Sequence, residues 1–187
     1  MNIVDRPLRW HRSRRDYKIE GALIHAMGEY IVVNGEAIPA WDFLDQSPDL
    51  VGEALSAHCL LVPSGDVIRC VSDDHRANHA GHSRFGFLED LNWTFLGAEW
   101  LLPGTWTYDP DFLREMGQGN VGFTDAQYEA GGELYAKWMK DYDFARSRIV
   151  GHSVVSGDEI RGEGRGKKDP GVGLNQGRLT IAIDRAA

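Results

Sequence analysis

The chain has 187 residues and a formal net charge of −8, with 42% hydrophobic and 26% charged residues. This length and composition are those of a single globular domain that can bury a core without disulfides. The acidic balance argues against a nucleic-acid-binding protein. The sequence contains no run of about 18 apolar residues, so we expect no transmembrane segment.

Residues 1–18 differ in charge from the rest of the chain, with six basic residues against two acidic ones. We interpret them as a basic N-terminal arm that is either solvated or in contact with an anionic surface, and residues 19–187 as one domain. The N-terminus lacks the apolar region and the cleavage site of a secretory signal. We therefore expect a protein made in the cytoplasm, so that a substrate outside it would require lysis or a secretion machine.

The next elements in chain order are short. Residues 19–24 are apolar and predict a buried strand that ends at His25. Residues 40–44 favour the start of a short helix, and the Ser-Pro-Asp sequence that follows is typical of a turn.

Residues 57–71 predict a hairpin. Two apolar stretches flank the sequence Pro-Ser-Gly-Asp, which consists of strong turn formers. If Val62 pairs with Val67, then Cys59 lies opposite Cys70. The two cysteines are then either core thiols or, in an oxidising compartment, a cross-strand disulfide.

The middle of the chain alternates between loops and regular elements. Residues 72–86 are rich in His, Asp, Asn and Gly and are typical of a loop, whereas residues 94–101 predict a central strand that contains Glu99. Residues 103–123 hold prolines and glycines and predict mostly connection. Residues 124–142 predict the clearest helix, because a Thr-x-x-Gln capping box precedes apolar residues at helical spacing.

The predicted helix contains Gly131 and Gly132, each of which costs on the order of 1 kcal/mol in helix stability. A close approach to a sheet would explain them. Residues 148–150 predict a strand, and a final helix or strand is expected near residues 177–183. Strands and helices mix without a strict βαβ repeat, which predicts an α/β fold of the α+β type, with a mixed central β-sheet flanked by helices.

Two of the seven histidines, His25 and His152, directly follow predicted strands, where a side chain is held by a sheet and opens onto a cleft. Asp169 precedes a Pro-Gly turn. Two imidazoles and one carboxylate are a common ligand set of catalytic zinc, with a fourth position left for water. The residues alone leave a second interpretation open, in which each histidine is a hydrogen-bonded structural residue.

Seven motifs follow one another between about residue 19 and residue 179. They are Ala22-Leu23-Ile24-His25, Ser56-Ala57-His58, His79-Ala80-Gly81-His82-Ser83, Leu91-Asn92 with Leu96-Gly97-Ala98-Glu99, Phe123-Thr124-Asp125-Ala126-Gln127-Tyr128, Ile149-Val150-Gly151-His152-Ser153 and Gly166-Lys167-Lys168-Asp169-Pro170-Gly171. In this order they resemble the N-acetylmuramoyl-L-alanine amidase family, which includes phage amidase endolysins, cytosolic anhydro-muropeptide amidases and animal peptidoglycan recognition proteins.

The resemblance implies a zinc-dependent hydrolase that cuts the amide between N-acetylmuramic acid and L-alanine in peptidoglycan. It implies roles for seven residues: His25, His152 and Asp169 as ligands of one Zn²⁺, Glu99 as general base, Lys167 as catalytic lysine, and His79 and Ser83 as contacts to a peptidoglycan or muropeptide substrate. Taken without the resemblance, Glu99 is equally a paired strand carboxylate and Lys167 a solvated loop charge. For His58 we expect a structural hydrogen-bonding role.

The stretch between His152 and Asp169 is longer than usual in the family, and residues 158–165 resemble an insertion. This insertion is a lid, a specificity loop or a solvated excursion.

Several alternatives for function also stay open. The protein is a bacteriolytic phage endolysin with antimicrobial action, an injected effector or a cytosolic recycling amidase, and the divergent cleft rim and the basic arm favour the first two. Two other classes are a non-catalytic peptidoglycan-binding module and a zinc peptidase of the stem peptide. In each case we expect a monomer.

Overall fold

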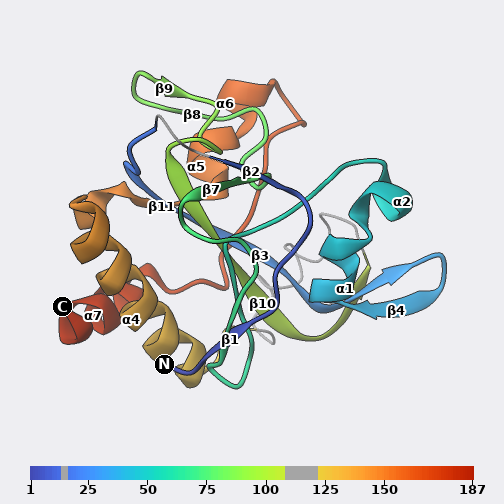
Figure 1. Ribbon diagram of the computed structural model, residues 1–187, viewed down its shortest axis with the longest axis horizontal. Helices are drawn as coiled ribbons and strands as arrows, with labels where there is room; N and C mark the ends of the chain where they lie inside the picture. The colour runs from blue at the N-terminus through green and yellow to red at the C-terminus, as the bar shows by residue number, and fades with distance from the viewer. Residues whose placement is uncertain (14–16, 108–121) are drawn as a thin grey trace.

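The computed structural model describes residues 1–13, 17–107 and 122–187, which form a mixed β-sheet with helices on both faces (Figure 1). The strands of this sheet, in the order in which they lie, are β1 (Ile3–Asp5), β6 (Val67–Arg69), β5 (Cys59–Leu61), β10 (Phe95–Thr107), β3 (Gly21–Val33) and β11 (Ile149–Gly151), with β4 (Glu36–Pro39) paired to β3. β10 runs parallel to both neighbours, whereas the β5–β6 and β3–β4 pairs are antiparallel. The predicted mixed central sheet is therefore confirmed.

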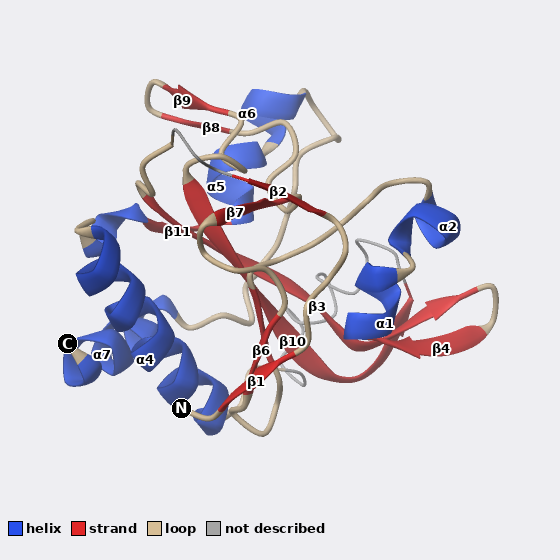
Figure 2. Cartoon of the chain, in the orientation of Figure 1, coloured by secondary structure: helices blue, strands red, loops and turns tan. Residues whose placement is uncertain are grey.

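Helices cover the sheet from two sides (Figure 2). The α-helices of the described residues are α1 (Ala40–Asp45), α2 (Ser47–Val51), α4 (Asp125–Tyr142), α5 (His152–Ser156), α6 (Asp158–Arg161) and α7 (Gln176–Ala186). On the face of α4 and α7, the core contains Ile24 and Trp100; on the face of α1, it contains Met27, Phe43 and Leu101. Because side chains alternate along a strand, β3 and β10 contribute to both cores.

The N-terminus of α4 is fixed to the sheet by one buried side chain. The predicted capping box is present, since the Thr124 hydroxyl accepts from the Gln127 backbone N–H at 3.1 Å and the Gln127 side chain accepts from the Thr124 N–H at 3.0 Å. The Gln127 amide also donates to the carbonyls of Leu61 and Leu101, at the ends of β5 and within β10. One glutamine therefore starts the helix and anchors it to two strands.

The two glycines of α4 stand where the helix meets its neighbours. A Cβ atom at Gly131 would lie 2.4 Å from the Trp100 ring, and one at Gly132 would lie 2.6 Å from the backbone of Ala182 in α7. The close approach to the sheet is therefore confirmed for Gly131, whereas Gly132 allows a close approach between two helices.

The N-terminal residues are part of the sheet, and the prediction of an irregular arm is wrong for residues 1–13. β1 pairs in parallel with β6, and Leu8 is buried and donates its N–H to the Cys70 carbonyl at 2.8 Å. β2 (His11–Ser13) pairs with β7 (His75–Ala77). The apolar Leu8 and the open edge of β6 supply the contacts that a solvated arm lacks. Arg14, Arg15 and Asp16 lie outside the described residues.

The predicted hairpin is present, but its register differs by one residue from the expected one. Leu61 pairs with Val67, so Cys59 lies opposite Arg69 and not opposite Cys70. Because a shift of one residue moves a side chain to the other face, the two thiols lie in the two separate cores. This arrangement excludes the cross-strand disulfide, and both cysteines are free and buried.

The strand predicted to end at His25 continues to Val33, so His25 lies inside β3 and not at its end. β10 pairs with β3 along its whole length, and the pairing with β4 extends β3 beyond the apolar run. The cleft position expected for His25 arises differently. β11 ends opposite Ile24 and β4 pairs only from Tyr30 onward, so β3 has no strand neighbour on that side at His25 among the described residues.

Other expectations differ in detail. The predicted loop at residues 72–86 contains β7 and β8 (Arg84–Phe85), which pairs with β9 (Leu88–Glu89). The final element is the helix α7. Of the predicted connection 103–123, residues up to Thr107 belong to β10, and residues 108–121 lie outside the described ones. None of the helices in the described parts of the chain has the length and apolar character needed to span a bilayer.

Replacing Gly131 with alanine should destabilise the protein, although alanine is the better helix former. The added Cβ would overlap the Trp100 ring, and such overpacking typically costs more than the ~1 kcal/mol of helix propensity gained. We expect the free energy of unfolding, measured by urea titration, to fall by roughly 1–2 kcal/mol. Glu129→Ala, at an exposed position of α4, is the matched control and should change it by less than ~0.5 kcal/mol. An unfolding midpoint of Gly131→Ala at or above that of the wild type would contradict this close packing.

Candidate active site

Strand register brings two titratable side chains to the same level of the sheet. His25 on β3 pairs with Glu99 on β10, and residues paired across parallel strands point to the same face. Their side chains therefore lie together on the face away from α4. Two residues before Glu99, Gly97 leaves room on this face, since a Cβ there would lie 2.5 Å from the His79 ring.

Asp169 reaches the same place from a loop that is tied to α5. β11 ends at Gly151 opposite Ile24, so His152 begins α5 beside His25. The Asp169 carbonyl accepts from the Ser153 N–H at 2.9 Å. A Cβ at Gly151 would lie 2.7 Å from Pro170, so glycine allows the loop to pack against the strand end.

The three predicted metal ligands form a compact buried cluster. The Asp169 Oδ2 atom lies 3.2 Å from His25 Nδ1 and 3.1 Å from His152 Nδ1. One ligand atom from each of the three residues lies within 4.8 Å of the others. At most 9% of each residue's surface is exposed. The sequence prediction that these three residues meet therefore agrees with the geometry.

Hydrogen bonds on the far side of the rings assign the tautomers of both histidines. His152 Nε2 lies 3.1 Å from the Ala80 carbonyl, which only accepts, so His152 carries its proton there. His79 Nε2 likewise donates to the Phe95 carbonyl at 3.1 Å, which leaves His79 Nδ1 as an acceptor for His25 Nε2 at 2.9 Å. Both Nδ1 atoms that face Asp169 are therefore lone pairs in the neutral rings.

This donor set fits a divalent cation. Two nitrogen lone pairs and a carboxylate oxygen converge without a proton between them, and each imidazole donates its other N–H to a protein acceptor. Histidine ligands of metals are usually oriented in this way. A cluster of three electron-pair donors that repel one another is best satisfied by a shared positive charge.

Burial also keeps these rings neutral. It lowers the pKa of His25 to about 4, and the charge of His152 lowers it further. Burial and the surrounding imidazoles lower the pKa of His79 well below its ordinary value. Burial alone would raise the pKa of Asp169, but its interactions with His152 and His25 outweigh this effect and hold the pKa well below its usual range. At neutral pH His25 and His79 are therefore neutral, and Asp169 is a carboxylate.

Glu99 has the opposite shift. Burial raises its pKa to about 8, the charge of Asp169 adds to the rise, and the charge of Lys167 opposes it. A carboxyl group with a pKa near the working pH can both take up and release a proton, as a general base and acid must.

A cavity of about 410 Å³ opens onto this cluster. It is lined by the three candidate ligands and by Glu99, His79 and Lys167, so six of the seven predicted site residues share it. Lys167 is exposed and is held by its backbone N–H, which donates to the Ser156 carbonyl at 2.8 Å.

Ser83 is the one predicted site residue that does not line this cavity. Its buried hydroxyl donates to the Gly81 carbonyl and accepts from the Leu91 N–H, both at 3.1 Å. It lines a separate cavity of about 500 Å³. His58 accepts from the Gly97 N–H at 2.9 Å and lies 3.0 Å from the His75 carbonyl, in agreement with the hydrogen-bonding role expected for it.

Asn92 has a positioning role that the sequence analysis did not assign. Its side-chain oxygen accepts from the backbone N–H groups of both His79 and Ala80 at 2.8 Å. It thereby fixes the backbone of His79 and Ala80. The His79 ring orients His25, and the Ala80 carbonyl orients His152. A buried asparagine directly ahead of a central strand was the available signal.

The raised pKa of Glu99 predicts a pH-dependent stability of the metal-free protein. The folded state holds this proton up to about pH 8, whereas the unfolded chain releases it near the ordinary value of 4.5. The folded state binds more protons in this interval, so the free energy of unfolding falls as pH rises through it. Glu99→Gln should therefore gain stability relative to the wild type from pH 4.5 to 8 in urea titrations with a chelator. A difference that does not change with pH would contradict the raised pKa.

Comparison with known proteins agrees with this geometry. The family model described as N-acetylmuramoyl-L-alanine amidase matches residues 15–172. Among curated proteins, the 1,6-anhydro-N-acetylmuramyl-L-alanine amidase AmpD of Escherichia coli K12 is 28% identical over 131 residues, which are 70% of this chain and 60% of that protein. AmpD of Enterobacter cloacae is 32% identical over 136 residues, 71% of this chain and 61% of that protein. The chain thus spans about 60% of the length of these two relatives.

Solved structures share the fold. A selenomethionine derivative of AmpD superimposes with a TM-score of 0.71 at 23% identity, covering 97% of this chain and 94% of that one. The amidase LysC from Clostridium intestinale gives 0.62 at 13% identity, with 98% of both chains covered. AmiD from E. coli, in complex with anhydro-N-acetylmuramic acid-L-Ala-D-γ-Glu-L-Lys, gives 0.60 at 21% identity, with 95% of this chain and 60% of that one covered. The family model covers most of the sequence, and so the chain belongs to the N-acetylmuramoyl-L-alanine amidase family.

Proposed function

We propose that this protein is a zinc-dependent amidase that hydrolyses the bond between N-acetylmuramic acid and L-alanine in a peptidoglycan fragment. The observation that carries the proposal is the convergence of two imidazole Nδ1 atoms on the Asp169 carboxylate, beside the titratable Glu99. The family of the chain and the activity in the names of its curated relatives support the same reaction.

His25, His152 and Asp169 would hold the zinc ion. Two nitrogen ligands and one oxygen ligand suit zinc in catalytic sites and leave a further position for water or substrate. Zinc supplies a Lewis acid that lowers the pKa of water and polarises the scissile carbonyl. The hydrogen bonds from the rings to Ala80 and His79 orient the two imidazoles toward this position.

Glu99 would move the proton of the reaction. Its carboxylate takes a proton from the attacking water as the water oxygen bonds to the amide carbon. It then delivers this proton to the L-alanine nitrogen as the carbon–nitrogen bond breaks. Its burial, which raises the pKa of the carboxyl group in the metal-free protein, favours uptake of this proton.

Lys167 would stabilise the charge that develops on the carbonyl oxygen. It lines the same cavity, and its charge acts on both Glu99 and His25. A fixed cation stabilises an oxyanion most effectively in a site that excludes water. His79 also lines the cavity and would contact substrate with the part of its ring that faces the opening.

The substrate we propose is a muropeptide of the kind named for the AmiD complex, in which L-alanine is followed by a γ-linked glutamate. The curated relatives act, by their names, on 1,6-anhydro-muramyl compounds, which favours a wall-recycling amidase. The endolysins among the solved structures are 12–16% identical to this chain, and this likeness shows the shared fold alone. We therefore propose a soluble muropeptide in preference to the intact wall.

Product analysis tests the reaction. With zinc, the purified protein should convert an anhydro-muramyl tripeptide into a peptide with a free L-alanine amino terminus. Chelation should stop this release and added zinc should restore it, because zinc supplies the Lewis acid. Release of a shorter peptide, with the muramyl–alanine bond intact, would indicate a peptidase. Binding of the muropeptide without any product would indicate a binding module. Faster release from intact sacculi than from the tripeptide would favour the endolysin.

Two variants separate metal binding from proton transfer. Asp169→Ala should lower zinc affinity in calorimetry by more than roughly 100-fold and lose turnover, because it removes a ligand. Glu99→Gln should bind zinc as the wild type does but lose roughly 10²–10⁴-fold in kcat. Asp184→Asn, on the exposed side of α7, is the control and should change neither. Normal turnover by Glu99→Gln would overturn its role as the base.

A further inference from the structure

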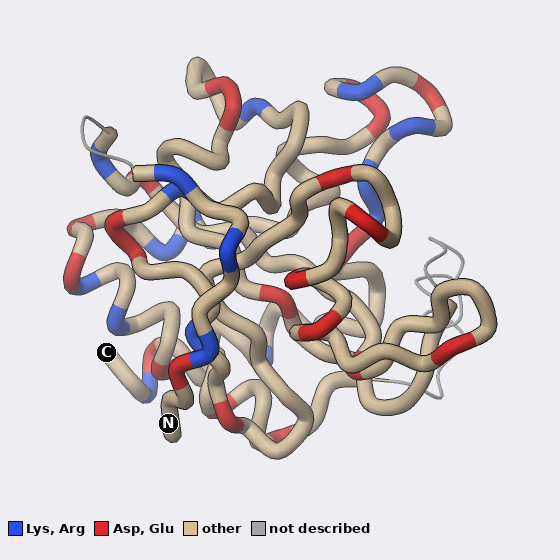
Figure 3. Tube along the Cα trace, turned by 45° about the vertical axis from the view of Figure 1, so that its right-hand side comes forward, with Lys and Arg blue, Asp and Glu red and all other residues tan. Residues whose placement is uncertain are grey.

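Residues 158–165, which resemble an insertion, form part of the wall of the cavity that contains the candidate ligands. This segment begins with α6, and its two ends lie close together. Asp158 accepts from the Gly166 N–H and pairs with the Lys168 ammonium, both at 2.7 Å. Acidic and basic residues follow one another along this segment (Figure 3). From it, Arg161, Gly164 and Arg165 line the cavity that contains the triad.

Within this wall, the Arg161 guanidinium is fixed in place by two hydrogen bonds. Its Nε donates to the Arg165 carbonyl at 3.1 Å, and its Nη1 donates to the Ser156 hydroxyl at 3.3 Å. Ser156 is fully buried and donates in turn to the His82 carbonyl at 2.6 Å. This chain of contacts ties the inserted segment to the loop that follows His79.

Arg161 has unused N–H donors and, within the described parts of the chain, no anionic partner. A guanidinium has five N–H groups, and the two bonds above use two of them. No carboxylate in the described residues forms an ion pair with Arg161 or Arg165, whereas Lys168 of the same segment is paired with Asp158. A partly buried, oriented guanidinium with free donors matches the geometry of a carboxylate.

The position of Arg161 relates directly to that of the metal ligands. The Ala80 carbonyl accepts from His152, and at the next residue, Gly81, a Cβ would lie 3.2 Å from Arg161 Nη1. One step of this loop thus connects the ring of a candidate zinc ligand with the guanidinium. Arg161 and the three candidate ligands line the same cavity, so a peptide bound there can contact both.

We propose that Arg161 binds the free α-carboxylate of the γ-linked glutamate, the second residue of the stem peptide. The inference rests on the proposed amidase function and adds the feature of the substrate that the inserted wall selects. A glutamate linked through its γ-carboxyl leaves its α-carboxylate free, one residue beyond the L-alanine whose amide is cut. The inserted segment is then a specificity element for an anionic stem peptide.

A matched pair of substrates tests this proposal. One is the muramyl-L-Ala-D-γ-Glu-L-Lys compound with the free α-carboxylate, and the other carries the α-carboxamide at the same position. The wild type should cleave the carboxylate form with a kcat/KM roughly 10- to 100-fold higher, as expected for a charge-assisted contact. Equal kcat/KM values for the two forms would overturn the proposal without any variant.

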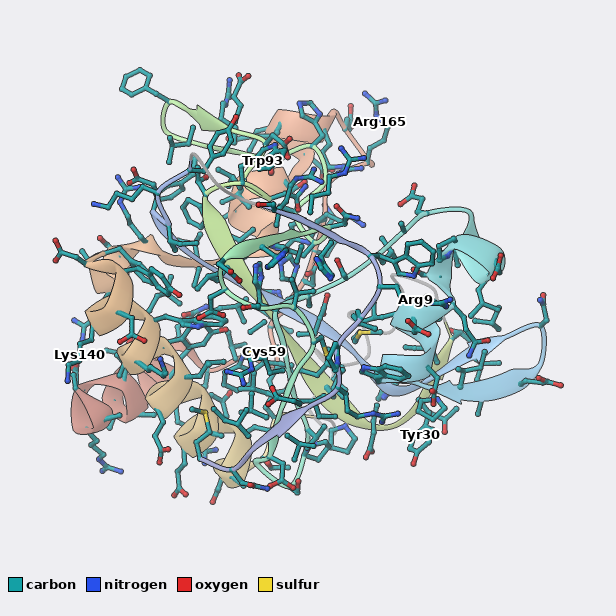
Figure 4. All side chains as sticks on the ribbon, in the orientation of Figure 1. Arg9, Tyr30, Cys59, Trp93, Lys140 and Arg165 are labelled. Atoms are coloured by element: carbon teal, nitrogen blue, oxygen red, sulfur yellow. The ribbon has the colours of Figure 1, made fainter. Side chains whose placement is uncertain are left out.

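Two arginine variants locate the effect. Arg161→Gln should lower kcat/KM for the carboxylate form to about that of the carboxamide form, while leaving the carboxamide form unchanged, which also reports an intact fold. Arg165→Gln tests the second arginine that lines the cavity, which lies at the outer end of the segment (Figure 4). This variant keeps the backbone carbonyl that accepts from Arg161 Nε. It should retain the wild-type preference. A preference that persists in Arg161→Gln would overturn the assignment.

Binding of the free peptide separates this inference from the proposed reaction. Calorimetry of the zinc-loaded wild type and Arg161→Gln proteins with L-Ala-D-γ-Glu-L-Lys and its α-carboxamide requires no turnover. Arg161-dependent preference for the carboxylate, in a protein that cleaves nothing, would support the subsite and overturn the amidase. Cleavage of both forms at equal rates would support the amidase and overturn the Arg161 subsite. If the protein neither binds nor cleaves the peptides, both proposals are overturned.

Discussion

The parallel pairing of β3 with β10 is the constraint on which the site depends. It sets His25 opposite Glu99 on one face of the sheet and leaves Trp100 on the other face, against α4. A shift of one residue in this register would place the imidazole and the carboxyl on opposite faces. β11 ends opposite Ile24. His25 therefore lies beyond the last residue paired with β11, and His152, which follows β11, lies beside it.

Around this frame, backbone carbonyls decide the chemistry of the imidazoles. The carbonyls of Ala80 and Phe95 accept protons from ring nitrogens, and His79 passes this constraint on to His25. As a result both Nδ1 lone pairs face Asp169. Two nitrogen lone pairs and a carboxylate repel one another when they are buried together. A cation bound between them would remove this repulsion, so the cluster favours a cation.

Burial serves the two kinds of group in opposite ways. It lowers the pKa of His25 and so keeps this ring neutral, which suits a ligand, and it makes Glu99 retain its proton up to about pH 8, which suits a group that exchanges protons. Arg161, which has no ion pair with any described residue, lines the same cavity as these groups. The sheet therefore holds the titratable cluster, while residues 158–165 form part of the wall of the cavity in front of it.

The sequence by itself determined the residue types, their order along the chain and the elements with strong local signals. The capping box of Thr124 and Gln127 started α4 as predicted, because a cap is satisfied within four residues. The same local order carried the family resemblance and the selection of His25, His152 and Asp169.

Only the tertiary structure decided the hairpin register that separates Cys59 from Cys70, the pairing of residues 1–13 with the sheet, and the length of β3 beyond His25. These features depend on hydrogen bonds between segments far apart in the chain, which no local pattern encodes. For the same reason the tautomers of the histidines, and the place of Arg161 beside them, followed only from the folded arrangement.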